Sequence, residues 1–340
     1  MIAEHLMDVV FPARDQSLAK VSAALSEADG GRVADNLVTN EDSFARVADA
    51  LEALAPRGGV YLGVGPDQNL TYLAHVRPRL AFVLDFRRRN GLLHYWHKAL
   101  LAFAPDRAGY LARLLARSPT KPLPLDPSAD ELVGAFEGAT LDRGRLKSTT
   151  AEVAGYLGPL GVVAEAEWPA LATIGAKLAG PGLDARFLAL PMYPTLGRLI
   201  RARDRLGRPA HFLASDERYR VVREAQLGDR VVPLVGDFAG PSSFRALGRW
   251  LRDRGLSVSA FYASDVEFFL IRSGKFAAYA GNLEALPWAE GAVVIRSSTR
   301  EIPHPERTPG DSSTTIVRPV APFLEKAKAG RIATVEDLFL

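Results

Sequence analysis

The stretch GGVYLGVGPDQNLTYLAHVRPRLAFVLDFRRRN, residues 58–90, decides the fold class of this chain. It opens with an apolar run at 59–65 that carries two glycines, continues with a helix-length segment, and closes with a second apolar run at 79–86. A strand, a crossover helix and a second strand form the unit from which parallel sheets are built. The stretch therefore predicts the start of an α/β core.

The remainder of the chain continues this alternation. Apolar runs typical of strands lie at 185–195, 231–238, 257–270 and 291–298, and two extended runs around a turn at Leu206–Gly207 predict a hairpin within 199–215. Amphipathic segments typical of helices lie at 87–104, after Ser215, at 244–255 and from 320 onward. We predict a Rossmann-like, doubly wound, mostly parallel sheet with helices on both faces.

Four segments are expected along the chain. Residues 1–55 read as a helical N-terminal extension, in which Thr39 or Asn40 can cap the second helix and which could serve as a lid or a dimer arm. Residues 56–116 would form the first half of the Rossmann-like domain, and 186–340 its second half with a C-terminal helix. Between them, 117–185 begins with a proline-rich loop and shows helical patches, which predicts an insertion or cap.

Composition narrows the class of protein. The chain has 340 residues, of which 48% are hydrophobic and 24% charged, and it has no cysteine, which excludes disulfides and thiolate chemistry. It shows no secretory signal and no apolar run of roughly 20 residues, so we expect a cytoplasmic protein without a membrane partner. The net charge is +3 and the arginines alternate with acids, so nucleic acid is not an expected partner. The pair His94 and His97 has no nearby acid motif that would complete a metal site.

The residues that follow the strands are the candidates for a ligand site, because ligands of open α/β sheets bind beyond the carboxyl ends of the strands. Gly63 and Gly65 permit a tight turn and close approach of the backbone to a ligand, and the following helix, with Asp67 and Asn69 in its first turn, offers free amides. Asp67 can alternatively cap that helix. Asp85 ends the second run about 20 residues after Gly63, the place of a ribose-binding acid.

Two later strands end in similar groups. Asp237 could accept a hydrogen from an adenine amino group while the adjacent ring of Phe238 packs on the base. Ser264, Asp265 and Glu267 in YASDVEFF follow another strand and would lie at the same edge of the sheet. Each of these residues also has an ordinary explanation in turn or capping chemistry, but together they predict one adenosine-sized site.

The motifs VYLGVGPDQN, VLD, VGDF and FYASDVEFFL resemble those of class I S-adenosylmethionine-dependent methyltransferases. More closely, GVGPDQN, VVPLVGDFAGP and FYASDVEFFL resemble a family of bacterial proteins mostly labelled uncharacterised or methyltransferase-like. The resemblance covers most of 35–300 and is weakest at 117–185. It departs from the methyltransferase pattern at Tyr61, where an acid is usual, and at Asp67, where a third glycine is usual.

The resemblance implies S-adenosylmethionine as cofactor and transfer of its methyl group, or of its aminocarboxypropyl group, to a small molecule. Cofactor-binding residues would be Gly63, Gly65, Asp67, Asn69, Asp85, Asp237, Phe238 and Ser264. Catalytic candidates are Glu41, Tyr262, Asp265 and Glu267, of which Glu41 or Glu267 could anchor or deprotonate an amine. Asn40, Arg87 and Tyr193 are candidates for substrate binding, with Arg87 able to hold a carboxylate.

Two further functions fit the same residues. The altered glycine motif allows a non-catalytic or regulatory protein that binds S-adenosylmethionine or a nucleotide on this scaffold. A nicotinamide-dependent oxidoreductase is the other alternative, although Gln68 stands where its fingerprint has a third glycine. The sequence indicates no particular substrate, and a homodimer is compatible with it.

Overall fold

The computed structural model describes residues 17–31, 36–299 and 302–339. Its centre is one six-stranded sheet in the order β3-β2-β1-β4-β5-β6. All neighbours are parallel except β6, which is antiparallel to β5. The strands are β1 (Val60–Gly63), β2 (Leu80–Asp85), β3 (Val231–Val235), β4 (Val258–Ser264), β5 (Trp288–Thr299) and β6 (Ser313–Pro319). The prediction of an α/β fold with a mostly parallel sheet is confirmed.

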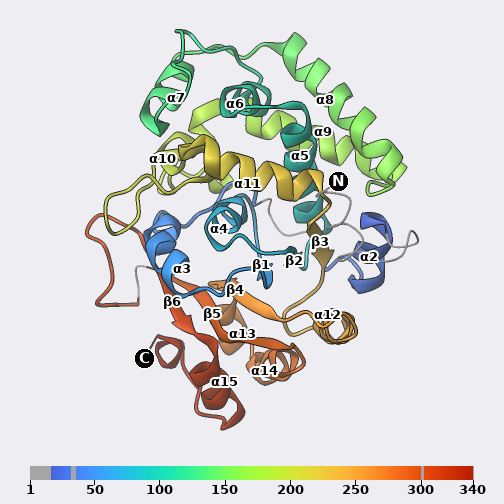
Figure 1. The fold of residues 1–340 in the computed structure, drawn as a ribbon, viewed down its shortest axis with the longest axis vertical. Helices are drawn as coiled ribbons and strands as arrows, with labels where there is room; N and C mark the ends of the chain where they lie inside the picture. Colours follow the sequence, from blue (N-terminus) through green and yellow to red (C-terminus); the bar gives the residue numbers. More distant parts are fainter. Residues whose placement is uncertain (1–16, 32–35, 300–301, 340) are drawn as a thin grey trace.

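Helices cover both faces of this sheet. In Figure 1, α4, α5 and α11 lie on one side and α12, α14 and α15 on the other, while α7, α8 and α9 lie beyond α5 and α6. The helices are α2 (Leu18–Leu25), α3 (Ala48–Leu54), α4 (Gln68–Val76), α5 (Arg88–Phe103), α6 (Arg107–Leu115), α7 (Ala129–Phe136), α8 (Arg143–Leu157), α9 (Trp168–Ala179), α10 (Leu196–Ile200), α11 (Asp216–Leu227), α12 (Ser243–Arg252), α13 (Val266–Arg272), α14 (Phe276–Glu284) and α15 (Val320–Lys328).

The central strands are buried on both faces, which explains their nearly continuous apolar sequences. Pro233 lies within β3, where it lacks the N–H needed for pairing on both sides, and β3 accordingly is an edge strand. The N-terminal segment covers that edge: the amide of Glu27 donates to the carbonyl of Val235 at 2.7 Å, and the hydroxyl of Ser22 donates to the carbonyl of Pro233. The predicted helical extension therefore packs on the sheet through α2, although its residues 1–16 and 32–35 lie outside the described ranges.

Several predicted elements are correct in kind and nearly correct in their limits. Helix α5 occupies most of 87–104, and α11 begins after Ser215, whose hydroxyl accepts from the amide of Arg218 at 3.3 Å. The helix after residue 40 begins instead with a 3₁₀ turn, Phe44–Val47, whose N-cap is Ser43 rather than Thr39 or Asn40.

Three predictions of extended structure are wrong. Segment 185–195 contains Pro191 and Pro194, which remove two donors, and its only regular piece is a 3₁₀ turn in which Leu188 has a left-handed φ of 51°. The expected hairpin at 199–215 reduces to α10 and one antiparallel bridge, Arg203 with Pro209. The strand after Val258 ends at Ser264 and gives way to α13, so the second half of FYASDVEFFL is helical.

Strand β6 (Ser313–Pro319) has no counterpart in the predicted elements. Its sequence, STTIVRP, contains only two strongly apolar residues, and it forms because β5 offers it a register of seven residue pairs from Val293–Pro319 to Thr299–Ser313. Antiparallel edge strands tolerate a polar face, so their apolar signal is weak.

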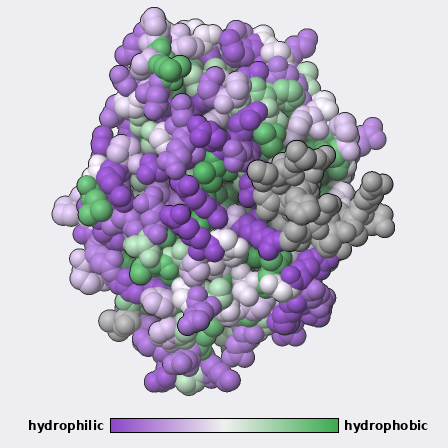
Figure 2. Space-filling model, in the orientation of Figure 1, coloured by the Kyte–Doolittle hydropathy of each residue, from purple (hydrophilic) through white to green (hydrophobic). Residues whose placement is uncertain are grey.

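The parallel strands β1 and β4 are neighbours at the centre of the sheet. From β1 the chain continues to β2 on one side, and from β4 it continues to β5 on the other side. Such a switch point opens a crevice at the carboxyl ends of the strands. Figure 2 shows a mainly hydrophilic face with hydrophobic residues in small scattered groups. Within the described ranges, no helix combines the length and the apolar character that a bilayer crossing requires.

Candidate functional site

A cavity of about 870 Å³ lies at the carboxyl ends of the strands. Its walls come from the residues that follow β1, β2 and β3, from the ends of β4 and β5, from the start of β6, and from segments 36–41 and 187–193. Of the residues singled out from sequence, ten line it: Asn40, Glu41, Gly65, Asp85, Arg87, Tyr193, Asp237, Phe238, Ser264 and Asp265. Gly63, Asp67, Asn69, Tyr262 and Glu267 are not among its lining residues, and their contacts explain why.

The side chain of Asn69 stabilises the turn after β1 by hydrogen bonds to its carbonyl groups. Its side-chain amide donates to the carbonyls of Val64, Gly65 and Pro66 at 2.9, 3.1 and 2.9 Å, and its oxygen accepts from the hydroxyl of Tyr61 at 2.7 Å. A Cβ at Gly63 would lie 2.1 Å from that oxygen, so Gly63 makes room for the Asn69 side chain. Gly63 and Asn69 thus shape the turn rather than contact the cavity.

Gly65 is the glycine of this turn that faces the cavity, and its φ is +79°. Replacing it with alanine imposes a left-handed conformation on a residue with a Cβ, at a cost of about 1–2 kcal/mol in the free energy of unfolding. The matched control is Gly58→Ala, because Gly58 has a φ of +76° with open space around it and is exposed. Urea unfolding should give similar losses, whereas titration calorimetry should show weaker binding of a cavity ligand to the Gly65 variant only. Equal binding by both variants would contradict a role of this turn in the site.

Asp67 anchors the segment that carries Glu41. Its carboxylate is buried and accepts from the amide of Thr39 at 3.0 Å, and burial raises its pKa to about 6. Asp67 shows no side-chain cap on α4, so its contribution is this link between α4 and segment 36–41.

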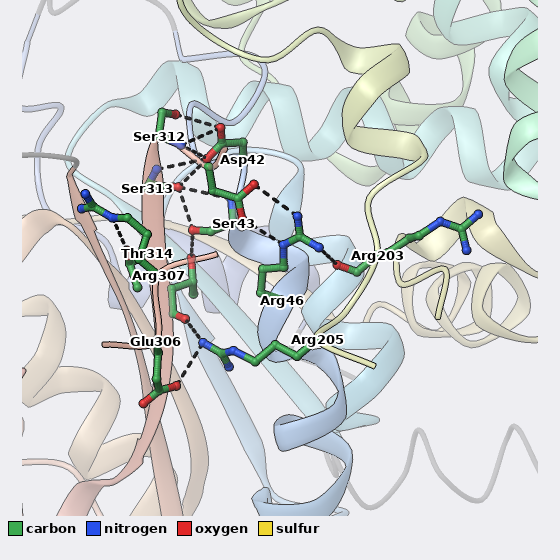
Figure 3. A network of polar contacts seen from close by, with 12 residues as sticks. Asp42, Ser43, Arg46, Arg203, Arg205, Glu306, Arg307, Ser312, Ser313 and Thr314 are labelled. Atoms are coloured by element: carbon green, nitrogen blue, oxygen red, sulfur yellow. Dashed lines mark hydrogen bonds and ion pairs between the residues drawn. The ribbon is translucent and has the colours of Figure 1, made fainter. Parts of the chain in front are cut away.

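Asp42 anchors the other side of the same segment. Figure 3 shows its carboxylate facing Ser312 and Ser313 at the start of β6, whose amides donate to it at 2.9–3.1 Å. Ser43 adds hydroxyl contacts to Ser313 and Thr315 at 2.7 and 2.8 Å. Glu41 therefore lies on a short segment that is fixed to α4 on one side and to β6 on the other.

Glu41 is the centre of a buried polar chain. Its Oε1 accepts from the hydroxyl of Tyr262 at 2.7 Å and from that of Ser264, while the side-chain amide of Gln68 donates to the Tyr262 oxygen at 2.9 Å. Glu41 is only 3% exposed. Burial, with the charge of Asp265 as a second cause, raises the pKa of Glu41 to about 7. A carboxyl group that titrates near neutrality can exchange protons with a bound molecule at physiological pH.

Ser264 ends β4 in an unusual conformation, and Asp265 follows it. The φ of Ser264 is +55°, a left-handed value that costs a non-glycine residue about 1–3 kcal/mol. This conformation ends the strand and accompanies the contacts of the Ser264 hydroxyl with Glu41 and with Asp265, the latter at 3.4 Å. Burial raises the pKa of Asp265 as well. Backbone strain of this kind is concentrated at functional sites.

Asp85 and Arg87 were expected to bind different ligands, but they bind each other. The guanidinium of Arg87 donates through Nε to Oδ1 and through Nη2 to Oδ2 of Asp85, both at 2.8 Å, and the Arg87 amide donates to Oδ1 at 3.0 Å. Both residues line the cavity. A carboxylate has about four acceptor positions, so Asp85 retains capacity for a further donor while the pair is intact.

Asp237 and Phe238 follow β3 and differ in exposure. The carboxylate of Asp237 is 43% exposed and lies 3.7 Å from the ammonium of Lys275. Phe238 is buried, with its ring parallel to that of Tyr279 at 5.9 Å and in edge contact with Phe244 at 5.2 Å. The expected stacking of Phe238 on a base is therefore replaced largely by packing within the core, with one edge of the residue at the cavity.

Glu267 points away from the cavity. It forms a buried ion pair with Arg296 of β5, in which Nη2 of Arg296 donates to Oε1 at 3.1 Å, and it accepts from the hydroxyl of Tyr279 at 2.8 Å. Both members of the pair are about 2% exposed. The catalytic role expected for Glu267 is replaced by a structural one, because α13 turns its side chain toward β5.

Other cavity residues were not selected from sequence. The polar ones are Asn36, Gln68, Ser273, Lys275, Ser297, Ser298, Ser312 and Ser313, and the others are Val64, Phe86, Phe187, Met192, Gly236, Val266, Phe269 and Leu270. Ser297 and Ser298 end an apolar run, so the rule that selected Ser264 could have found them. Ser312 and Ser313 precede β6, which the sequence did not reveal.

Four buried polar atoms of this cavity make no hydrogen bond within the part of the chain that the structure describes: Asn36 Oδ1, Glu41 Oε2, Gln68 Oε1 and Ser298 Oγ. Buried polar groups are almost always paired, so these unpaired atoms, three of which can only accept, mark a lining that suits a ligand with hydrogen-bond donors.

The described residues contain no group of three or more side chains that could hold a metal ion. The close pair His94 and His97 contacts other parts of the protein: His94 contacts the carbonyl of Gly65 at 2.9 Å, and His97 contacts the hydroxyl of Tyr110 at 2.8 Å.

These features define an α/β protein with a polar, partly acidic cavity at the carboxyl edge of its sheet. The chain belongs to the family described as a domain of unknown function, DUF7790, whose model matches residues 36–121 and 191–337. The unmatched stretch, 122–190, contains α7, α8 and α9. No curated protein matches the sequence.

Proposed function

We propose that this protein is an S-adenosylmethionine-dependent transferase with a Rossmann-like, class I methyltransferase-like fold, and that it methylates a small molecule. The strand order 3-2-1-4-5-6 is that of doubly wound nucleotide-binding sheets, and the cavity lies where this order predicts a ligand. Its volume of about 870 Å³ falls within the roughly 300–1,000 Å³ of small-molecule sites.

One observation carries the proposal: Gly65, Asp85 and Asp237, which follow three neighbouring strands, line a single cavity. These are the residues that the glycine, ribose and adenine motifs of the resemblance select. Coordinates in which the three loops faced separate hollows would have contradicted it. Their convergence in one cavity supports the proposal, because the three motifs together imply a single adenosine site.

The residues present suit the cofactor. A remaining acceptor position of Asp85 would take a ribose hydroxyl, and Asp237 would take the adenine amino group. The unpaired oxygens of Asn36 and Gln68 would accept from the α-ammonium group, in place of the acid that Tyr61 replaces. The lining contains the acids Glu41, Asp85, Asp237 and Asp265 but only the cations Arg87 and Lys275, a balance that favours a cationic ligand.

When bound, S-adenosylmethionine supplies an electrophilic methyl group on a sulfonium. The protein's own contribution is to position the acceptor, exclude water and take up a proton. Glu41 would receive this proton on Oε2, because the residue lines the cavity and this oxygen is buried without a hydrogen-bond partner within the described ranges. Tyr262 and Ser264 hold the other carboxylate oxygen and so fix the orientation of Oε2.

The direct test is binding of S-adenosylmethionine and S-adenosylhomocysteine by titration calorimetry. Asp85→Asn removes the charge while keeping the shape, and loss of a charged acceptor is worth about 1.5–3 kcal/mol, so we expect an affinity about ten- to a hundredfold lower. The control is Asp253→Asn, since Asp253 is exposed at the C-terminal end of α12. No binding to the wild-type protein at about 1 mM ligand, a free energy near −4 kcal/mol, would contradict the proposal.

Methyl transfer is tested in an experiment separate from cofactor binding. The protein is incubated with S-adenosylmethionine and a metabolite extract, and mass spectrometry follows the appearance of S-adenosylhomocysteine and of a product heavier by one methyl group. Binding of both cofactor forms without any such product would favour the non-catalytic alternative. Fluorescence of bound NADH, in a protein that binds neither sulfonium form, would favour the oxidoreductase.

A further inference from the structure

The cavity has two electrostatically different ends. Near β2 and β3, each acid has a cation beside it: Asp85 pairs with Arg87, and Asp237 lies 3.7 Å from Lys275. At the ends of β4 and β5, the charged lining residues are Glu41 and Asp265, which are linked through the hydroxyl of Ser264. Excess negative charge is therefore confined to the second end.

The carboxylate of Glu41 is built into this end as an acceptor. Its side chain is almost fully buried, and Oε2 makes no hydrogen bond to any described group. Two anchors, Asp67 to Thr39 and Asp42 to Ser312 and Ser313, hold the flanking residues, so Glu41 cannot move to solvent without breaking them. Leaving a buried carboxylate oxygen unpaired is costly unless a ligand supplies the donor.

Apolar residues line the same cavity. Val266, Phe269 and Leu270 belong to α13, which begins directly after Asp265, and Phe187, Met192 and Tyr193 come from segment 187–193. Met192 is 72% exposed and Phe269 59% exposed, although both line a cavity. A ligand with a hydrophobic body would cover this surface and gain about 25 cal/mol for each Å² of it that is buried.

We propose that the end of the cavity at Glu41 and Asp265 binds a primary or secondary amine that carries a compact aromatic or aliphatic group. Its nitrogen donates to Oε2 of Glu41, and its apolar group lies against Met192, Tyr193 and Phe269. The inference rests on the proposed function only in naming this amine as the methyl acceptor, since the binding itself needs no cofactor. Carboxylates and phosphates are disfavoured here, because the buried Glu41 and the partly buried Asp265 would repel them.

The test is calorimetric binding at pH 8 of three probe amines: phenethylamine, cyclohexylmethylamine and tryptamine. Each is compared with the analogue that carries a hydroxyl in place of the amino group and with one that carries a carboxylate, with and without S-adenosylhomocysteine. We expect at least one amine to bind about tenfold or more tightly than its alcohol, and the carboxylates to bind least, because a charged donor is paired with Glu41. Failure of all three amines in both conditions, or equal binding of amine and alcohol, overturns the inference.

Glu41→Gln should reduce the affinity for the amine about tenfold or more while leaving that for the alcohol unchanged. The matched control is Glu325→Gln, at an exposed position of α15. Amine binding that is unchanged in Glu41→Gln also overturns the assignment. The two proposals can be contradicted independently. Binding of an amine without binding of S-adenosylmethionine contradicts only the proposed methyltransferase function. Binding of S-adenosylmethionine without binding of any amine contradicts only the amine site.

Discussion

Replacing Glu267 with alanine is expected to lower the free energy of unfolding by about 3–5 kcal/mol, because it leaves the buried guanidinium of Arg296 without its counter-charge. The hydroxyl of Tyr279 loses its acceptor in the same step. Arg296 lies 3.8 Å from the centre of the Phe323 ring and cannot reach water without disturbing the packing of α15. Urea unfolding followed by circular dichroism measures the loss.

Two further variants separate the charge from the shape. Glu267→Gln keeps acceptors for Tyr279 and Arg296 and should cost less than the alanine variant. The double variant Glu267→Leu with Arg296→Met removes both charges, and such replacements are commonly neutral or stabilising by about 1–4 kcal/mol. A small effect of Glu267→Ala, within about 0.5 kcal/mol as for ordinary surface positions, would show that the ion pair is not buried as described.

Glu41→Gln is expected to stabilise the protein at pH 8 and to do so much less at pH 5. The rise of the Glu41 pKa from 4.5 to about 7 corresponds to about 3 kcal/mol, at about 1.4 kcal/mol per pH unit. The folded state binds this proton more tightly than the unfolded chain, so stability falls as the pH rises from 4.5 to 7, and above pH 7 the full cost of the buried charge is present. Glutamine carries no charge and still accepts from Tyr262 and Ser264.

The measurement is the free energy of unfolding of wild-type and variant protein at pH 5 and pH 8. The difference between them should grow by up to about 3 kcal/mol in favour of glutamine across that interval. Asp67, whose pKa is raised to about 6, titrates in both proteins and cancels in the comparison. A difference that does not change with pH would show that Glu41 is not held charged in a buried site. If Glu41→Gln raises the free energy of unfolding and also loses amine binding, Glu41 lowers stability but serves function.

The parts of the candidate site that were predictable from sequence follow strands directly. Gly65, Asp85 and Asp237 each come at the end of an apolar run, and parallel strands bring their carboxyl ends to one edge. Local sequence was enough to place them there, since register in a buried strand is set by its own apolar pattern. The same reasoning correctly indicated helices α5 and α11.

The roles of the candidate site residues depend on the directions of their side chains, which the local sequence does not predict. Glu41 and Glu267 were equivalent candidates, yet Glu41 lines the cavity and keeps one oxygen unpaired within the described ranges, whereas Glu267 is paired with Arg296. The difference arises because Ser264 takes a left-handed φ and ends β4, so that Glu267 lies on a helix instead of continuing the strand. Arg87, expected to hold a substrate, instead neutralises Asp85.

The sequence by itself determined the alternation of strands and helices, and with it the α/β class and the edge of the sheet at which polar residues gather. The tertiary structure alone decided which of those residues share a cavity, because β6, the serines at its start and the segment around Glu41 meet only through pairing between distant parts of the chain. Short-range periodicity reports which face of an element is apolar. Contacts between residues more than two hundred positions apart, such as Glu41 with Tyr262, depend on how the whole sheet is assembled.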